Sequence, residues 1–184
     1  MRPWLVIVLV IAAGFGAFQY VRPVLWPPPV PLENEDYQIT KVQPYILEAL
    51  VLATKDYRRK EGGEVMPVDL ALAWGTMADP DKADRLEIDQ RNRFYYWKAD
   101  GPTLQALGRS NIEGNTANVH CVPADDLVRT SLFQVRPGER ILLKGHLVDI
   151  RGPDRSWSTS RSRTDTGPGA CEIFLIETLT RSRG

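Results

Sequence analysis

The stretch SWSTSRSRTDTGPGACEIFLIETL, residues 156–179, carries the clearest fold signal in the chain. Its first half alternates serine with bulkier side chains, which is the two-residue period of a β-strand. Segment 165–169 is rich in Gly, Pro and Asp, and the apolar run after Cys171 predicts a returning strand. We therefore expect a hairpin here.

Strand signals also outnumber helix signals upstream of this hairpin. Runs of β-branched and aromatic residues at 45–57 and 86–98 each predict one strand, although 47–53 would also suit a helix. Segment 140–150 predicts a strand that bends at Gly145 and forms a three-strand meander with the hairpin. Only 123–133 predicts a helix, because Pro and acidic residues open it.

The remaining segments are expected to be mostly loops. Clusters of polar residues and glycine predict loops at 58–63, 78–81 and 108–117, while the apolar stretch 68–74 suits either a strand or a helix. The domain of residues 33–184 is accordingly expected to be mainly β. We expect a small barrel of the OB or SH3-like kind with one short helix, and the sequence does not choose between those two barrels.

The N-terminus predicts a membrane anchor. Residues 3–21 carry no charge and are long enough for a helix that nearly spans the hydrocarbon core. We predict a single-pass transmembrane helix at 1–22 and a Pro-rich linker at 23–32, with the domain on the extracytoplasmic side. A cleaved signal peptide is the alternative interpretation.

Charge balance excludes one class of partner. Lys and Arg number 23, and Asp and Glu also number 23. A chain without a basic excess gains nothing from the phosphate field of a nucleic acid, so we expect no such partner.

Four motifs together resemble a known group of proteins. They are PVDLA at 67–71, NRFYYW at 92–97, NVH with PAD at 118–125, and DTGPGACE at 165–172. This combination is similar to a group of uncharacterised bacterial membrane-anchored proteins. The resemblance spans most of the domain and implies an anchored bacterial envelope protein, but no established activity.

Cys121 and Cys171 are the only cysteines in the chain. In an exported domain, two cysteines predict one disulfide, which would close a loop of about 50 residues. Two inert buried thiols, or one reactive thiol, are the alternatives.

A reactive thiol would need a base beside it, and that base needs an orienting group. Neighbours in a strand point to opposite faces, so His120 suits Cys171 as a base, whereas Cys121 would need His146. We take His120, Cys171 and Glu172 as candidate catalytic residues. No paired metal-ligand spacing is present, so we expect neither a metal nor a cofactor.

Two further groups are candidate binding residues. Tyr95, Tyr96 and Trp97 form an aromatic run for which core packing is favoured over ligand contact. Arg161 and Arg163 suit a lipid-headgroup or acidic-partner face, and a solvated strand explains them equally well.

These observations predict a membrane-anchored envelope protein. We expect its β-domain to bind a partner protein without catalysis. The alternatives are a thiol or acid/base hydrolase, or a glycan- or lipid-binding module, acting in the envelope.

Overall fold

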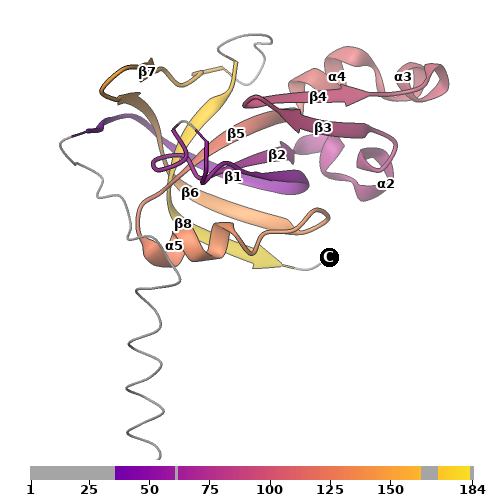
Figure 1. Ribbon diagram of the computed structural model, residues 1–184. Coiled ribbons are helices and arrows are strands. Elements are labelled where there is room, and N and C mark those ends of the chain that lie inside the picture. The colour runs from indigo at the N-terminus through magenta and orange to yellow at the C-terminus, as the bar shows by residue number, and fades with distance from the viewer. Residues whose placement is uncertain (1–35, 61, 163–169, 183–184) are drawn as a thin grey trace, which may run out of the picture.

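The computed structural model describes residues 36–60, 62–162 and 170–182 (Figure 1). This part of the chain is mainly β, as the sequence predicts, and its main sheet has the strand order β1-β2-β5-β8-β6-β7. The six strands are β1 (Gln38–Asp56), β2 (Val68–Ala73), β5 (Thr116–Pro123), β6 (Arg140–Arg151), β7 (Ser156–Trp157) and β8 (Glu172–Ser182).

Strand β1 is the longest strand described, and it pairs with both β2 and β6. It pairs with β6 along most of its length and with β2 through its C-terminal half, both in antiparallel fashion. The remaining pairs are also antiparallel, except that β5 and β8 run parallel. The apolar stretch 68–74, ambiguous in the sequence, is therefore mostly strand.

The predicted bend at Gly145 is confirmed. The β6–β8 register shifts between Lys144 and Gly145, which marks a bulge. A Cβ placed on Gly145 would lie 2.0 Å from the carbonyl oxygen of Leu175. Only glycine lets the two strands approach this closely.

The predicted three-strand meander is wrong. Strand β6 lies between β7 and β8, and β7 ends at Trp157. Beyond it, mostly side-chain bonds hold the chain: Thr159 N–H donates to Asp149 Oδ1 at 2.9 Å, and Ile173 N–H donates to Thr159 Oγ1 at 2.9 Å. One backbone bond joins them, from Ser160 N–H to the carbonyl oxygen of Cys171 at 3.2 Å. These bonds bring segment 159–160 against the start of β8 without forming a second strand pair.

The predicted single strand at 86–98 is also wrong. The segment is a hairpin of β3 (Glu87–Arg91) and β4 (Phe94–Lys98), which forms a separate two-stranded sheet. Asn92 and Arg93 turn the chain with φ of 54° and 67°. Two central residues with positive φ are typical of the two-residue hairpin turn that matches strand twist.

Short helices replace two of the predicted loops. A 3-10 turn η1 (Gly75–Ala78) and α2 (Pro80–Ala83) occupy the first. Helices α3 (Gly101–Leu107) and α4 (Arg109–Gly114) precede β5. Figure 1 shows α2, α3 and α4 gathered near the same end of the main sheet as the β3–β4 hairpin.

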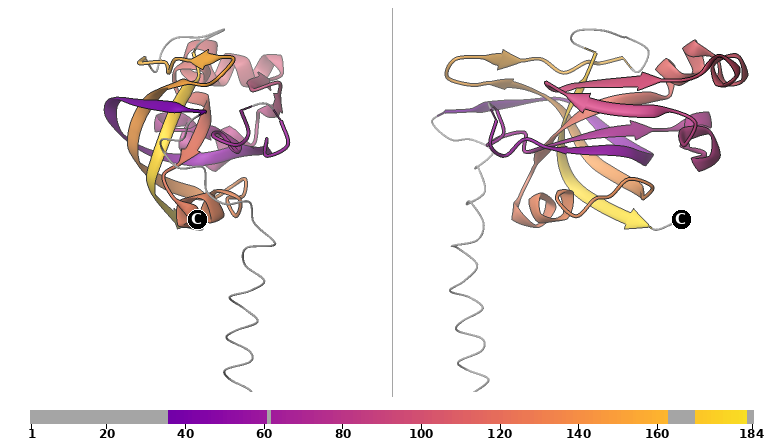
Figure 2. Two further views of the ribbon diagram at one scale, coloured as in Figure 1. Left: turned by 60° about the vertical axis from the view of Figure 1, so that its left-hand side comes forward. Right: turned by 45° about the vertical axis from the view of Figure 1, so that its right-hand side comes forward.

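The one predicted helix is confirmed. Helix α5 (Asp126–Leu132) begins after Asp125, whose Oδ1 accepts a hydrogen bond from Val128 N–H at 2.8 Å. A carboxylate at this position satisfies an N–H group that the first helical turn leaves without a partner. The helix packs against β8 (Figure 2).

The core divides over the two faces of the main sheet. One face buries a cluster that includes Leu70, Leu143 and Phe174, with Tyr45 edge-on to Phe174 at 5.0 Å between ring centroids. On the other face, one cluster lies around Val148. A third cluster lies between the sheet, the hairpin and α2 to α4. The hairpin therefore packs on the face of the sheet opposite Phe174, which we call the outer face.

The predicted anchor at 1–22 and linker at 23–32 lie outside the described residues. None of the helices between residues 36 and 182 that the structure describes combines the length and the apolar character needed to cross a bilayer.

Candidate functional site

A buried carboxylate lies at the centre of a polar cluster on the outer face of the sheet. Asp69 of β2 has 1% of its side chain exposed, although the strand around it is apolar. It pairs with His120 of β5 in the antiparallel register, and its Oδ1 lies 3.0 Å from His120 Nδ1. A carboxylate only accepts hydrogen bonds, so Nδ1 carries the proton.

His120 also hydrogen-bonds to the side chain of Cys171. The parallel register explains why His120 and Cys171 are close. His120 pairs with Ile173, and Cys171 lies two residues before Ile173, so its side chain is on the same face of the sheet. With Nδ1 held by Asp69, Nε2 is the ring nitrogen left for other partners. His120 therefore has Asp69 and Cys171 as its two side-chain partners.

The charge on His120 follows from its neighbours. Burial lowers the pKa of the imidazole, but the hydrogen bonds and charges of Asp69 and Cys171 outweigh burial and raise the pKa to about 9. The ring is therefore protonated at neutral pH. His120 therefore presents a positive charge to the side chain of Cys171.

Arg93 and Asn118 hold the carboxylate from its other sides. Arg93 Nη1 donates to Asp69 Oδ1 at 2.8 Å and to the carbonyl oxygen of Met66 at 2.9 Å. Asn118 Nδ2 donates to Asp69 Oδ2 at 3.2 Å, and Gln90 Nε2 donates to Asn118 Oδ1 at 2.7 Å. Asp69 is therefore bonded through both oxygens.

Cys121 lies on the opposite face from this cluster. It is fully buried in the core, its Sγ donates to the carbonyl oxygen of Val119 at 3.6 Å, and burial raises the pKa of the thiol well above its usual value. Both cysteines are free thiols, so the structure does not contain the predicted disulfide between Cys121 and Cys171. The alternation of β5 side chains separates the two sulfurs.

Glu172, the third candidate catalytic residue, is not part of the cluster. It is buried and pairs with Val119, whose side chain belongs to the core on the other face of the sheet. The carboxylate that contacts His120 is that of Asp69.

The aromatic run on β4 is not buried on both faces, contrary to the favoured prediction. Phe94 and Tyr96 are each 41% exposed, with ring centroids 6.5 Å apart. Tyr95 and Trp97 face the sheet, where burial raises the pKa of Tyr95 to about 12. The physical reason is the hairpin: an isolated pair of strands has only one face to pack.

Of the two candidate arginines, the structure describes only Arg161, which is not part of the cluster. Arg161 is exposed and lies 3.9 Å from Asp149 in an ion pair. Arg163 lies outside the described residues. Exposed pairs at such distances contribute little to stability.

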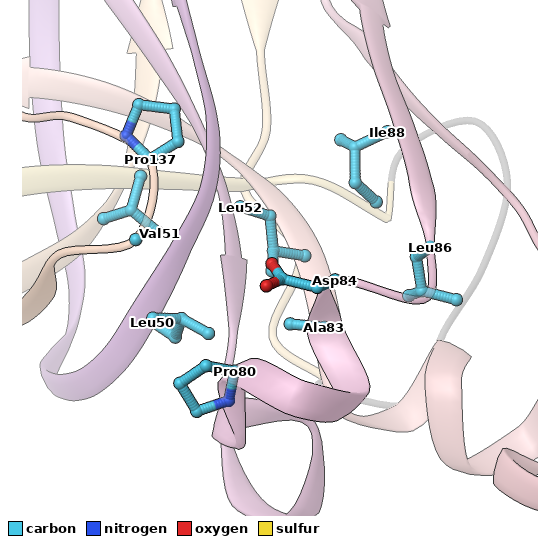
Figure 3. Close-up of a pocket in the computed structure, with 10 residues that line it drawn as sticks. Leu50, Val51, Leu52, Pro80, Ala83, Asp84, Leu86, Ile88 and Pro137 are labelled. Carbon is cyan, nitrogen blue, oxygen red and sulfur yellow. The ribbon is translucent and has the colours of Figure 1, made fainter. Parts of the chain in front are cut away.

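A separate cavity of about 420 Å³ opens elsewhere on the outer surface, between β1, α2, β3 and the loop after α5. Figure 3 shows Leu50 and Val51 on one side and Leu86 and Ile88 on the other. The cavity is lined mostly by apolar side chains, and none of them belongs to the Asp69 cluster. Asp84 brings the only charge.

The sequence interpretation missed Asp69 and Arg93. One signal was present for Asp69: it is the single charged residue in the apolar run 65–74. A charged residue at a buried position is rarely accidental and points to a paired or functional site. No pattern in the sequence pointed to Arg93, because its position depends on a hairpin turn that the local sequence does not predict.

No protein-family model, no curated protein and no solved structure matches this chain. Among the residues with described positions, no group of three or more His, Cys, Asp or Glu side chains is arranged to hold a metal ion.

Proposed function

We propose that this chain is a thiol-dependent acyl-transfer enzyme that hydrolyses amide or ester bonds, with Cys171 as its nucleophile. One observation carries the proposal: the hydrogen-bonded series of Asp69, His120 and Cys171. A nucleophile, a base and a group that orients the base form the arrangement that activates a weak nucleophile in many unrelated enzymes.

Each residue has a defined role in the reaction. The Cys171 thiolate attacks the substrate carbonyl carbon, a C–S bond forms, and the leaving amine or alcohol takes the proton from His120 Nε2. Water then attacks the thioester, gives a proton back to His120, and the thiolate leaves. Asp69 keeps Nδ1–H in place, which fixes the tautomer and stabilises the protonated ring.

The first test measures the alkylation of Cys171 by iodoacetamide in the full-length chain, with the modified site assigned by peptide mass. His120→Gln is expected to slow alkylation at pH 7 by about tenfold, because the thiolate loses its cation. His146→Gln is the matched control, since His146 meets Glu177 on the surface at 3.1 Å, away from the cluster. Equal rates in all three proteins would overturn the proposal.

The second test looks for the covalent intermediate. Incubation with an activated acyl ester is expected to leave the acyl group on Cys171 as a thioester that hydroxylamine removes. Cys171→Ala should abolish this product, and Cys121 should stay unmodified because it is buried. Acylation of lysines alone, with Cys171 unlabelled, would contradict the proposed function.

A second candidate function is partner binding without catalysis, and the exposed face of the hairpin favours it. Phe94 and Tyr96 lie on this face, and the Arg91 guanidinium is 4.6 Å from the Tyr96 ring centroid. Aromatic residues and arginine are enriched at protein interfaces. Tyr96 also belongs to the predicted binding residues.

This candidate is tested by capture. Two full-length variants, Phe94→Ser and Tyr96→Ser, are each compared with the wild-type chain. The measurement is the set of proteins in the membrane fraction that become crosslinked to each chain. Loss of the same crosslinked band in both variants supports binding through this face. Unchanged crosslinking in both excludes the face as the binding surface.

The setting of the site is also part of the proposal. We propose that residues 1–22 anchor the chain in a bacterial membrane and that the domain acts on envelope material on the extracytoplasmic side, which the uncharged run 3–21 supports. We further propose that the sheet is a small barrel of the OB or SH3-like kind. The double pairing of β1 with β2 and β6 supports that view.

A further inference from the structure

We infer that Arg93 is a positioning residue for Cys171, because it holds Asp69 and shares one carboxylate oxygen with His120. The inference rests on the proposed function. Arg93 is not expected to touch the substrate; it acts on the nucleophile through Asp69 and His120.

The first argument is the shared oxygen. Arg93 Nη1 and His120 Nδ1 lie 2.8 Å and 3.0 Å from the same Asp69 Oδ1. When two cations contact the same carboxylate oxygen, the positive charge of one weakens the net attraction that the other feels. Arg93 thereby limits how strongly Asp69 stabilises the protonated imidazole.

The second argument is how firmly Arg93 is held. Its main-chain N–H donates to Tyr57 Oη at 2.9 Å, and its carbonyl oxygen accepts a hydrogen bond from Asn118 Nδ2 at 3.2 Å. Its guanidinium lies 4.0 Å from the centroid of the Tyr57 ring. A guanidinium stacked on an aromatic face is oriented as well as attracted.

The third argument is the backbone at the turn. Arg93 has φ of 67°, a region that side chains other than Gly, Asn and Asp seldom adopt. The hairpin turn places the residue there at a cost, and the contacts with Tyr57, Met66 and Asp69 offset that cost. Backbone in such a region often accompanies functional sites.

The groups that face His120 come from three elements besides its own strand. They are Asp69 from β2, Arg93 from the hairpin turn and Cys171 from the segment before β8, while Asn118 on β5 itself is neutral. When a substitution removes the charge of Arg93, the Asp69 carboxylate stabilises protonated His120 more strongly. The imidazolium should then persist to higher pH.

The test is the pH dependence of Cys171 alkylation, recorded from pH 6 to 10 in the full-length chain. In this rate–pH curve, the alkaline inflection marks the pH at which His120 loses its proton. Arg93→Gln is expected to move that inflection upward by roughly half a pH unit or more. Arg93→Lys, which keeps the cation, should restore the wild-type inflection. Arg91→Gln is the matched control: Arg91 is in the same hairpin but exposed, and it contacts Asp89 and the Tyr96 ring rather than Asp69.

A purely structural role for Arg93 would lower stability and leave the inflection where it is. An unchanged or downward-shifted inflection in Arg93→Gln therefore overturns the inference. If this variant does not fold, Tyr57→Leu serves instead, because it removes the ring beneath the guanidinium and should shift the inflection in the same direction by less. The proposed function fails separately, when His120→Gln leaves the wild-type rate unchanged.

Discussion

Asp69 and His120 lie directly opposite each other on two antiparallel strands, and a distance of 3.0 Å joins Asp69 Oδ1 to His120 Nδ1. Asp69 is buried, 13% of the His120 side chain is exposed, and a third charge, that of Arg93, contacts the same oxygen. Buried charges that depend on one another in this way have measurable consequences for both stability and its pH dependence.

Replacing Asp69 with Asn should destabilise the domain by about 3 kcal/mol, because Arg93 and His120 lose the charge that compensates them in a buried site. Urea unfolding at pH 7 measures the effect. Asp89→Asn is the control, since Asp89 is exposed and its ion pair with Arg91 is exposed too, and it should change stability by less than about 1 kcal/mol. A change of similar size in both variants would show that the Asp69 charge has no special role.

Stability should fall on the alkaline side of neutrality. The pKa of His120 is raised from 6.5 to about 9 in the folded chain. Because the folded state binds this proton more tightly than the unfolded state does, the protonated ring stabilises the fold. The contribution is complete below pH 6.5 and disappears as the pH rises through 9. Unfolding free energies between pH 6 and 10 should drop by at most about 3 kcal/mol, and His120→Gln should flatten this part of the curve. A wild-type curve as flat as that of the variant would contradict the raised pKa.

Gly145→Ala should destabilise the domain severely, by about 3 kcal/mol or more, because the new Cβ would lie 2.0 Å from the Leu175 carbonyl oxygen. Gly114→Ala is the control. A Cβ there has no neighbour within 4 Å, and alanine is the better helix former, so a small gain of about 0.5 kcal/mol is expected. Thermal unfolding of both variants ranks them, and a Gly145→Ala protein as stable as wild type would refute the close approach of β6 and β8.

The two faces of the β3–β4 hairpin should respond differently to truncation. Tyr96→Ser removes a ring that is 41% exposed and should cost less than about 1 kcal/mol. Trp97→Ala removes a ring packed against the cluster beneath the hairpin and should cost about 3 kcal/mol. Urea unfolding checks the ranking, and a reversed order would mean that the exposed face of the hairpin packs in solution.

The β character, the bulge at Gly145 and helix α5 could be predicted because each has a local cause. Alternation of side chains, a glycine within an apolar strand and an acidic helix start are written in adjacent residues. The hairpin at 87–98 could not be predicted in the same way, because only Asn92 favours positive φ and Arg93 does not. Its turn is stabilised by Tyr57 and Asn118, which are distant in sequence.

The candidate site was half visible in the sequence. Alternation within one strand was enough to exclude Cys121 as the partner of His120 and to leave Cys171. Choosing Asp69 over Glu172 as the carboxylate required the strand order, since Asp69 is in β2 and reaches His120 only because β2 lies beside β5. Strand order is a long-range property that local patterns do not encode.

The parallel pairing of β5 and β8 has a consequence for how the protein is made. Strand β8 is the last to leave the ribosome among the described strands, yet it inserts between β5 and β6. Cys171 therefore meets His120 only after the rest of the sheet has been synthesised. A nascent chain holds its thiol apart from its base, and nucleophilic reactivity at Cys171 should appear at the end of folding, as a reporter of its completion.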